Sequence, residues 1–202
     1  MIFSYNPKHV GDTLMVILAD DHNKENFVES KGNVSRVFTE DGTVAWNLFH
    51  ISETVALTGN GQVTLTDEEL AQVNQLIQAA GFIEQLAADH EPKIVVGYVQ
   101  SCEKHPDSDH LSVTMTEVAP GEVLQIVCGA PNVAAGQKVV VAKPGAMMPD
   151  GLLIWSGELR GVKSDGMICS ARELHLPDAP TEKGILVLPE DAVIGTAFQV
   201  GK

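Results

Sequence analysis

The second half of the chain alternates short apolar runs with turns rich in glycine and proline, and this spacing limits the possible folds. Between residues 111 and 116, apolar and polar residues alternate, which is typical of a strand with one buried face. Further short, mainly apolar segments at residues 94–99, 123–128, 138–142, 152–155 and 185–188 predict strands. Five or six short strands within about a hundred residues favour a small closed or nearly closed β-barrel.

The first half has a different pattern. Apolar runs at residues 1–5 and 13–19 and the strand-like segments 34–38 and 44–51 predict strands, and a helical period follows them. Thr66 and Glu69 have the spacing of a capping box at a helix start, and Gly81 suits the helix end. A polar, proline-containing segment at 88–93 separates the halves. We therefore expect a small α+β domain over residues 1–89 and an all-β domain over residues 90–202.

Charge and composition exclude some classes of protein. The net charge is −14, and residues 1–92 hold most of it, with four Lys and Arg against 14 Asp and Glu. Such acidity argues against a general nucleic-acid binder with a broad basic face. No apolar run approaches the roughly 20 residues that span a bilayer, and the N-terminus lacks signal-peptide features. We expect a cytoplasmic protein that does not contact membranes and keeps its three cysteines as free thiols.

The segment from Arg160 to Ser170 gathers groups that suit an anionic, partly aromatic ligand such as RNA. Arg160 and Lys163 supply positive charge, and Gly161 and Gly166 allow the backbone to turn sharply. Ser164 adds a hydroxyl, and Met167 adds an apolar surface. A surface turn with no binding role is the alternative interpretation of this segment alone, because a short motif does not confirm itself.

Three segments together resemble a known family. They are His105-Pro106-Asp107-Ser108-Asp109-His110-Leu111, Ile126-Val127-Cys128-Gly129-Ala130-Pro131-Asn132, and Arg160-Gly161 followed by Ser164 and Gly166-Met167. In this order they resemble the tRNA-binding domain of the bacterial phenylalanyl-tRNA synthetase β subunit and of EMAP-like proteins. The N-terminal half resembles that of the stand-alone YtpR-type proteins. Two positions depart from the family pattern: Ser108 replaces an alanine, and His110 replaces a lysine.

The resemblance implies an OB-fold for residues 90–202 and a function in binding tRNA or other structured RNA. It leads us to expect phosphate contacts, base stacking and no catalysis, cofactor or metal. Asn132 is expected either to read a base edge or to hold its own turn. Arg160→Ala and Ser164→Ala are expected to weaken RNA binding and to leave the melting temperature nearly unchanged. The predicted RNA-binding residues are Lys104, His105, Asn132, Lys143, Arg160, Lys163, Ser164, Gly166 and Met167.

Other functions stay open on the sequence alone. A small barrel also suits a protein-interaction module or a homodimer, and an acidic chain favours a basic protein partner. The resemblance also allows an accessory domain in aminoacyl-tRNA synthesis. The pattern of His and Asp between 105 and 110 matches no familiar metal site. The role of residues 1–89 is not indicated by any motif.

Overall fold

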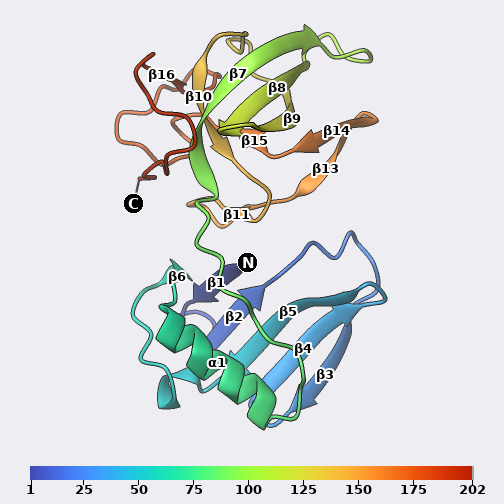
Figure 1. Ribbon diagram of the computed structural model, residues 1–202, viewed down its shortest axis with the longest axis vertical. Coiled ribbons are helices and arrows are strands. Elements are labelled where there is room, and N and C mark those ends of the chain that lie inside the picture. Colours follow the sequence, from blue (N-terminus) through green and yellow to red (C-terminus); the bar gives the residue numbers. More distant parts are fainter. Residues whose placement is uncertain (202) are drawn as a thin grey trace. The chain divides into compact units, whose positions relative to one another are not determined.

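The computed structural model describes residues 1–201 and divides into two compact units, Met1–His90 and a second that begins at Glu91. In the first unit, six antiparallel strands form one sheet in the order β3-β4-β5-β2-β1-β6 (Figure 1). Its elements are β1 Ile2–Tyr5, β2 Thr13–Ile17, β3 Phe27–Lys31, β4 Val34–Thr39, β5 Gly42–Phe49, the 3-10 helix Ile51–Glu53, β6 Gly61–Val63 and α1 Asp67–Ala79.

The helix α1 begins at the predicted capping box. The Thr66 hydroxyl accepts a hydrogen bond from the Glu69 N–H at 3.2 Å, and the Glu69 carboxylate accepts one from the Thr66 N–H at 2.7 Å. These two bonds satisfy backbone donors that have no partner inside the helix. Val73 and Ile77 are fully buried and share a core with Trp46 of β5. The helix therefore covers one face of the sheet.

This unit is richer in strand than the sequence pattern indicated. Strands β3 and β6 were not predicted, and α1 is the one α-helix among residues 1–201. The apolar pattern of β3 is weak because Phe27 and Val28, at 44% and 64% exposure, lie on an edge strand. The unit is thus a β-rich sheet with one covering helix. None of the helices in residues 1–201 is long and apolar enough to cross a membrane.

The second unit is built almost entirely of strands. Its main sheet has the order β15-β10-β7-β8-β9, with β16 beside β10. Two further pairs, β11 with β12 and β13 with β14, extend from it (Figure 1). The strands are β7 Ile94–Lys104, β8 Ser112–Ala119, β9 Glu122–Cys128, β10 Lys138–Ala142, β11 Ala146–Met147, β12 Leu153–Ile154, β13 Ser156–Leu159, β14 Val162–Asp165, β15 Met167–Ile168 and β16 Val187–Leu188.

Strand β10 is the centre of this unit because both of its faces are buried. Val139 and Val141 belong to one apolar cluster, and Val140 and Ala142 belong to another. Gly97 of β7 lies opposite Val139, and a Cβ at Gly97 would meet a methyl of Val141 at 2.7 Å. The apolar run 139–142 of β10, which is typical of a strand buried on both sides, agrees with this position.

Side chains join the outer edge of β9 to β14. The Val127 N–H donates to the Ser164 hydroxyl at 3.0 Å, and the Gln125 amide donates to the Lys163 carbonyl at 2.8 Å. No backbone ladder between β9 and β14 closes the sheet within residues 1–201. The unit is barrel-like, and the closed OB-fold barrel expected from the resemblance stays a prediction.

Candidate nucleic-acid interface

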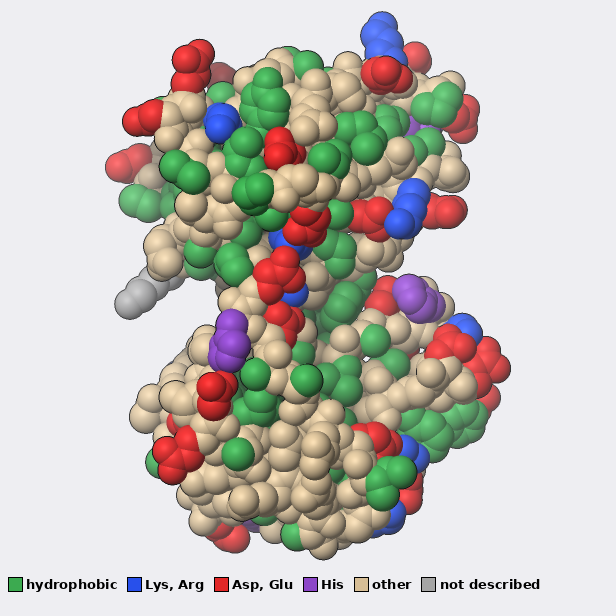
Figure 2. All heavy atoms as spheres, viewed as in Figure 1, with side chains coloured by type: hydrophobic (Ala, Val, Ile, Leu, Met, Phe, Trp, Pro, Cys, Tyr) green, Lys and Arg blue, Asp and Glu red, His purple; other side chains and the backbone are tan. Residues whose placement is uncertain are grey.

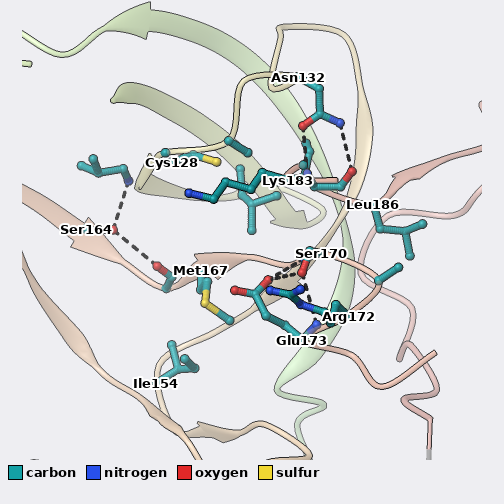
Figure 3. Close-up of a pocket in the computed structure, with 18 of the residues that line it drawn as sticks. Cys128, Asn132, Ile154, Ser164, Met167, Ser170, Arg172, Glu173, Lys183 and Leu186 are labelled. Carbon is teal, nitrogen blue, oxygen red and sulfur yellow. Dashed lines mark hydrogen bonds between the residues drawn. The ribbon is translucent and has the colours of Figure 1, made fainter. Parts of the chain in front are cut away.

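The second and third sequence motifs meet at one cleft of about 840 Å³ in the C-terminal unit. One wall contains residues 127–130 and Asn132, and another contains parts of β13 and β14 together with Gly166 and Met167. Segments 170–173 and 180–187 complete the lining (Figure 3). A cleft of this size lies within the roughly 300–1,000 Å³ range of small-ligand sites.

The segment from Arg160 to Ser170 is not the single loop that the sequence indicated. Arg160 and Gly161 form the two-residue turn of the β13–β14 hairpin, with φ of 48° and 75°. Positive φ at both positions is the requirement of a type I′ turn, which suits the twist of a hairpin. A non-glycine residue in this conformation is uncommon. The turn places Arg160 at the hairpin tip, where its guanidinium donates to the Asp107 carbonyl at 3.0 Å.

The first motif supports this hairpin. His105 is 4% exposed, and its Nδ1 accepts a hydrogen bond from the Asp107 N–H at 3.0 Å. Its Nε2 lies 3.0 Å from the Leu159 carbonyl at the end of β13 and donates to it. Because both ring nitrogens already have partners, this geometry argues against the RNA contact predicted for His105. Lys104, one residue earlier, is exposed.

Ser164 and Gly166 shape the wall of the cleft. Ser164 is 4% exposed, accepts from Val127 and lies 3.4 Å from the Gly166 carbonyl, so its hydroxyl is not the free donor we expected. Gly166 has φ of 126°, and a Cβ there would lie 2.7 Å from the Ala142 carbonyl oxygen. Only glycine meets both conditions without strain. Met167, which follows in β15, is half-buried and lines the cleft.

Asn132 turns toward the protein. Its side-chain oxygen accepts from the Ile185 N–H at 2.9 Å, and its amide donates to the Ile185 carbonyl at 3.0 Å. This pair of bonds holds the segment around Ile185 against the second motif, as Figure 3 shows. The amide groups needed to read a base edge are already in use, and they hold the distant Ile185 segment rather than the turn of Asn132 itself.

Lys143 lies away from the cleft and is not a free cation. It is 6% exposed, and its ammonium forms ion pairs with Glu91 and with Glu122, the latter at 2.9 Å. Burial lowers the pKa of Lys143, but the two carboxylates outweigh that effect and raise it. Its charge is already neutralised within the protein, which argues against the phosphate contact predicted for Lys143.

Comparisons with known proteins agree with the motifs. A family model described as "Putative tRNA binding domain" matches residues 94–197, just over half of the chain. A Bacillus subtilis (strain 168) protein named "Putative tRNA-binding protein YtpR" is 51% identical over 197 residues, which cover 96% of this chain and 98% of that protein. The chain belongs to the YtpR-type family. The family resemblance predicted from the three motifs is confirmed.

Further relatives match a smaller share of this YtpR-type protein. The phenylalanine–tRNA ligase β subunit of Oceanobacillus iheyensis is 51% identical over 142 residues. That match covers 67% of this chain and 17% of the subunit. The C-terminal domain of Plasmodium vivax p43 is a solved structure with 24% identity and a TM-score of 0.39, covering 55% of this chain and 61% of that one. Residues 21–89 match a model described as a "Domain of unknown function".

The free positive charges of this YtpR-type protein differ from those that the motifs indicated. Lys163 pairs with Asp165 at 2.8 Å, which weakens its attraction for phosphate. Within residues 1–201, four exposed cations of the C-terminal unit make no ion pair with a carboxylate: Lys104, Arg160, Arg172 and Lys183. Arg172 and Lys183 line the cleft. Motif reasoning missed both because they lie outside the three motifs and only the fold brings them to the cleft.

The surface charge is mixed. In Figure 2, basic side chains on the visible face are separated from one another by acidic and uncharged ones. Glu158, Glu173 and Glu182 also line the cleft. The Glu173 carboxylate is already hydrogen-bonded within the protein, because it accepts from the N–H and the hydroxyl of Ser170 at 2.7 Å and 2.6 Å. The mixture limits the cleft to a few defined anion contacts.

The cysteine in the cleft has the environment of a structural thiol. Cys128 is buried, and burial raises the pKa of its thiol. Burial also raises the pKa of Cys169 to about 12. A thiol with a raised pKa is a poor nucleophile at neutral pH. Within residues 1–201, no group of three or more His, Cys, Asp and Glu is arranged to hold a metal ion.

Proposed function

We propose that this YtpR-type protein binds tRNA, or RNA folded in a similar way, on the hairpin and cleft of its C-terminal unit without catalysing a reaction. One observation carries the proposal: two motifs far apart in the sequence line one cleft beside cations that have no carboxylate partner. The nearly full-length relative named as tRNA-binding supports it. An OB-fold would present such a surface for phosphates and stacked bases.

The predicted site residues fall into two groups in this proposal. Lys104, Arg160 and Met167 face solvent or the cleft and are proposed to contact RNA directly, with a weaker contribution from Lys163. Arg160 suits a phosphate because its planar guanidinium donates several hydrogen bonds in a fixed geometry. The others support the surface from within: His105, Asn132, Ser164 and Gly166.

The role of the N-terminal unit is left outside this proposal. Its acidic composition makes it an unsuitable phosphate contact, and its matching family has no described function. A location in the cytoplasm, where tRNA is used, is part of the proposal. The second unit is proposed to supply the RNA-binding surface of the chain.

Titration of labelled tRNA at two salt concentrations tests the proposal. With about four unpaired cations, the slope of log affinity against log salt is expected to be no steeper than about three to four. Arg160→Ala should weaken binding, whereas Lys8→Ala, which removes an exposed charge from the other unit, should not. Binding that ignores both salt and Arg160→Ala would place the RNA site elsewhere. An absence of tRNA binding at low salt would refute the function.

A further inference from the structure

The cleft has the size and lining of a site for one small flat group rather than for an RNA helix. Its volume is about 840 Å³, and Ile154, Met167 and Leu186 give it an apolar interior. Ile154 is 7% exposed and belongs to the apolar core beneath the cleft, against which Met167 packs. A base-paired helix presents its phosphates and sugars outward, whereas an unpaired base can enter a cleft and stack.

Two cations stand at this apolar cleft without acidic partners. Arg172 and Lys183 both line it and are exposed, and no ion pair ties either of them to a carboxylate within residues 1–201. Figure 3 shows the Lys183 side chain extending across the cleft toward the wall that carries Ser164. Lys143 differs from these two cations, because two carboxylates form ion pairs with it and neutralise its charge. Unpaired cations beside an apolar cleft match a ligand that joins an anion to a flat apolar ring.

The acidic side chains of the lining restrict the anion to one position. Glu158 and Glu182 repel a phosphate backbone that would track along the cleft. Glu173 is held by the N–H and hydroxyl of Ser170, which directs its charge toward the protein. A single phosphate between Arg172 and Lys183 avoids most of this repulsion, and a continuous phosphate track does not. The charge pattern therefore favours one nucleotide.

We propose that the cleft receives one unpaired nucleotide of the bound RNA, with its base against Ile154 and Met167 and its phosphate between Arg172 and Lys183. This inference rests on the proposed function, since it specifies which part of the RNA enters the site. Selectivity then comes from unpaired nucleotides in a folded RNA rather than from its paired stems. It also gives the two cations missed by motif reasoning a role distinct from that of Arg160.

The test compares two RNA hairpins that share one paired stem, of which only one carries a short unpaired 3′ tail. Wild type is expected to bind the tailed hairpin more tightly. Lys183→Ala and Arg172→Ala should each reduce the ratio of the two affinities about tenfold, as loss of a charge-assisted hydrogen bond implies. Lys8→Ala is the matched control and should keep the preference. Melting temperatures of all variants check that they fold.

A second measurement separates this inference from the proposed function. Adenosine monophosphate, titrated into wild type and Lys183→Ala while NMR signals are recorded, should perturb the signals of Met167 and Ile154 only in wild type. The inference would be overturned, with tRNA binding intact, by three results together. Wild type would bind both hairpins equally, the two variants would keep wild-type affinity, and the nucleotide would perturb no signal at the cleft. A nucleotide effect at the cleft without any tRNA binding would instead refute the function and keep the cleft as a nucleotide site.

Discussion

Ser164→Ala should destabilise the C-terminal unit, in contrast to the neutral effect expected from its place in a motif. The hydroxyl is buried and accepts the hydrogen bond of the Val127 N–H at 3.0 Å, on the edge of β9. Alanine removes the acceptor and leaves a buried N–H without a partner. That loss costs about 1–3 kcal/mol. At roughly 4 °C for each kcal/mol in a unit of this size, the melting temperature should fall by about 4–12 °C.

Two measurements test this prediction, one on the stability of the C-terminal unit and one on the hydrogen bond of the Val127 N–H. Scanning calorimetry of the full chain should show the lower transition temperature. Hydrogen exchange should show that the Val127 amide loses protection relative to the amides of the β7–β8 ladder, because that amide loses its acceptor. Thr181→Ala is a suitable control, since Thr181 lines the same cleft, is exposed and makes no side-chain hydrogen bond within residues 1–201.

A Ser164→Ala protein that melts like wild type and keeps Val127 protected would refute this reasoning. If that protein also lost tRNA binding, the hydroxyl would be a direct RNA contact, as the motif alone indicated. A fall in melting temperature together with weaker binding, largely restored by Ser164→Thr, would instead show that the hydroxyl acts by holding the wall of the cleft. The control should stay within about 0.5 kcal/mol of wild type.

Three further outcomes are expected. Gly166→Ala should lose more than about 1 kcal/mol of unfolding free energy, measured in urea, because its φ is positive and a Cβ would lie 2.7 Å from a carbonyl oxygen; an unchanged midpoint would contradict this. The hydrogen bond from Lys143 lowers the pKa of Glu91 from its usual value, so the pair stabilises the fold at neutral pH and this effect is lost as acid protonates the carboxylate. Lys143→Met should therefore reduce stability at pH 7 more than in acid that protonates Glu91, and equal losses would count against the pair. Cys128 and Cys169 should resist thiol reagents at pH 7 until the protein is unfolded, because burial raises the pKa of both; rapid labelling of all three cysteines in the native protein would disprove this.

Sequence alone determined the features that depend on neighbouring residues. The capping box at Thr66 and Glu69 marked the start of α1, because both partners lie within one helical turn. The strand predicted at 138–142 has the bounds of β10, because the apolar residues 139–142 show the unbroken pattern of a strand buried on both faces. The three motifs identified the family, since their order and spacing are themselves properties of the chain.

Tertiary structure decided which polar groups are free. Lys143 is neutralised by Glu91, 52 residues away, and Asn132 is occupied by Ile185, 53 residues away. Both partners come from other segments, so no local pattern shows that these side chains are already engaged. In the same way, Arg172 and Lys183 belong to no motif and become neighbours of the cleft only when the strands assemble. Charge and hydrogen-bonding capacity at a site depend on long-range contacts, whereas capping and strand burial depend on residues close together in the chain.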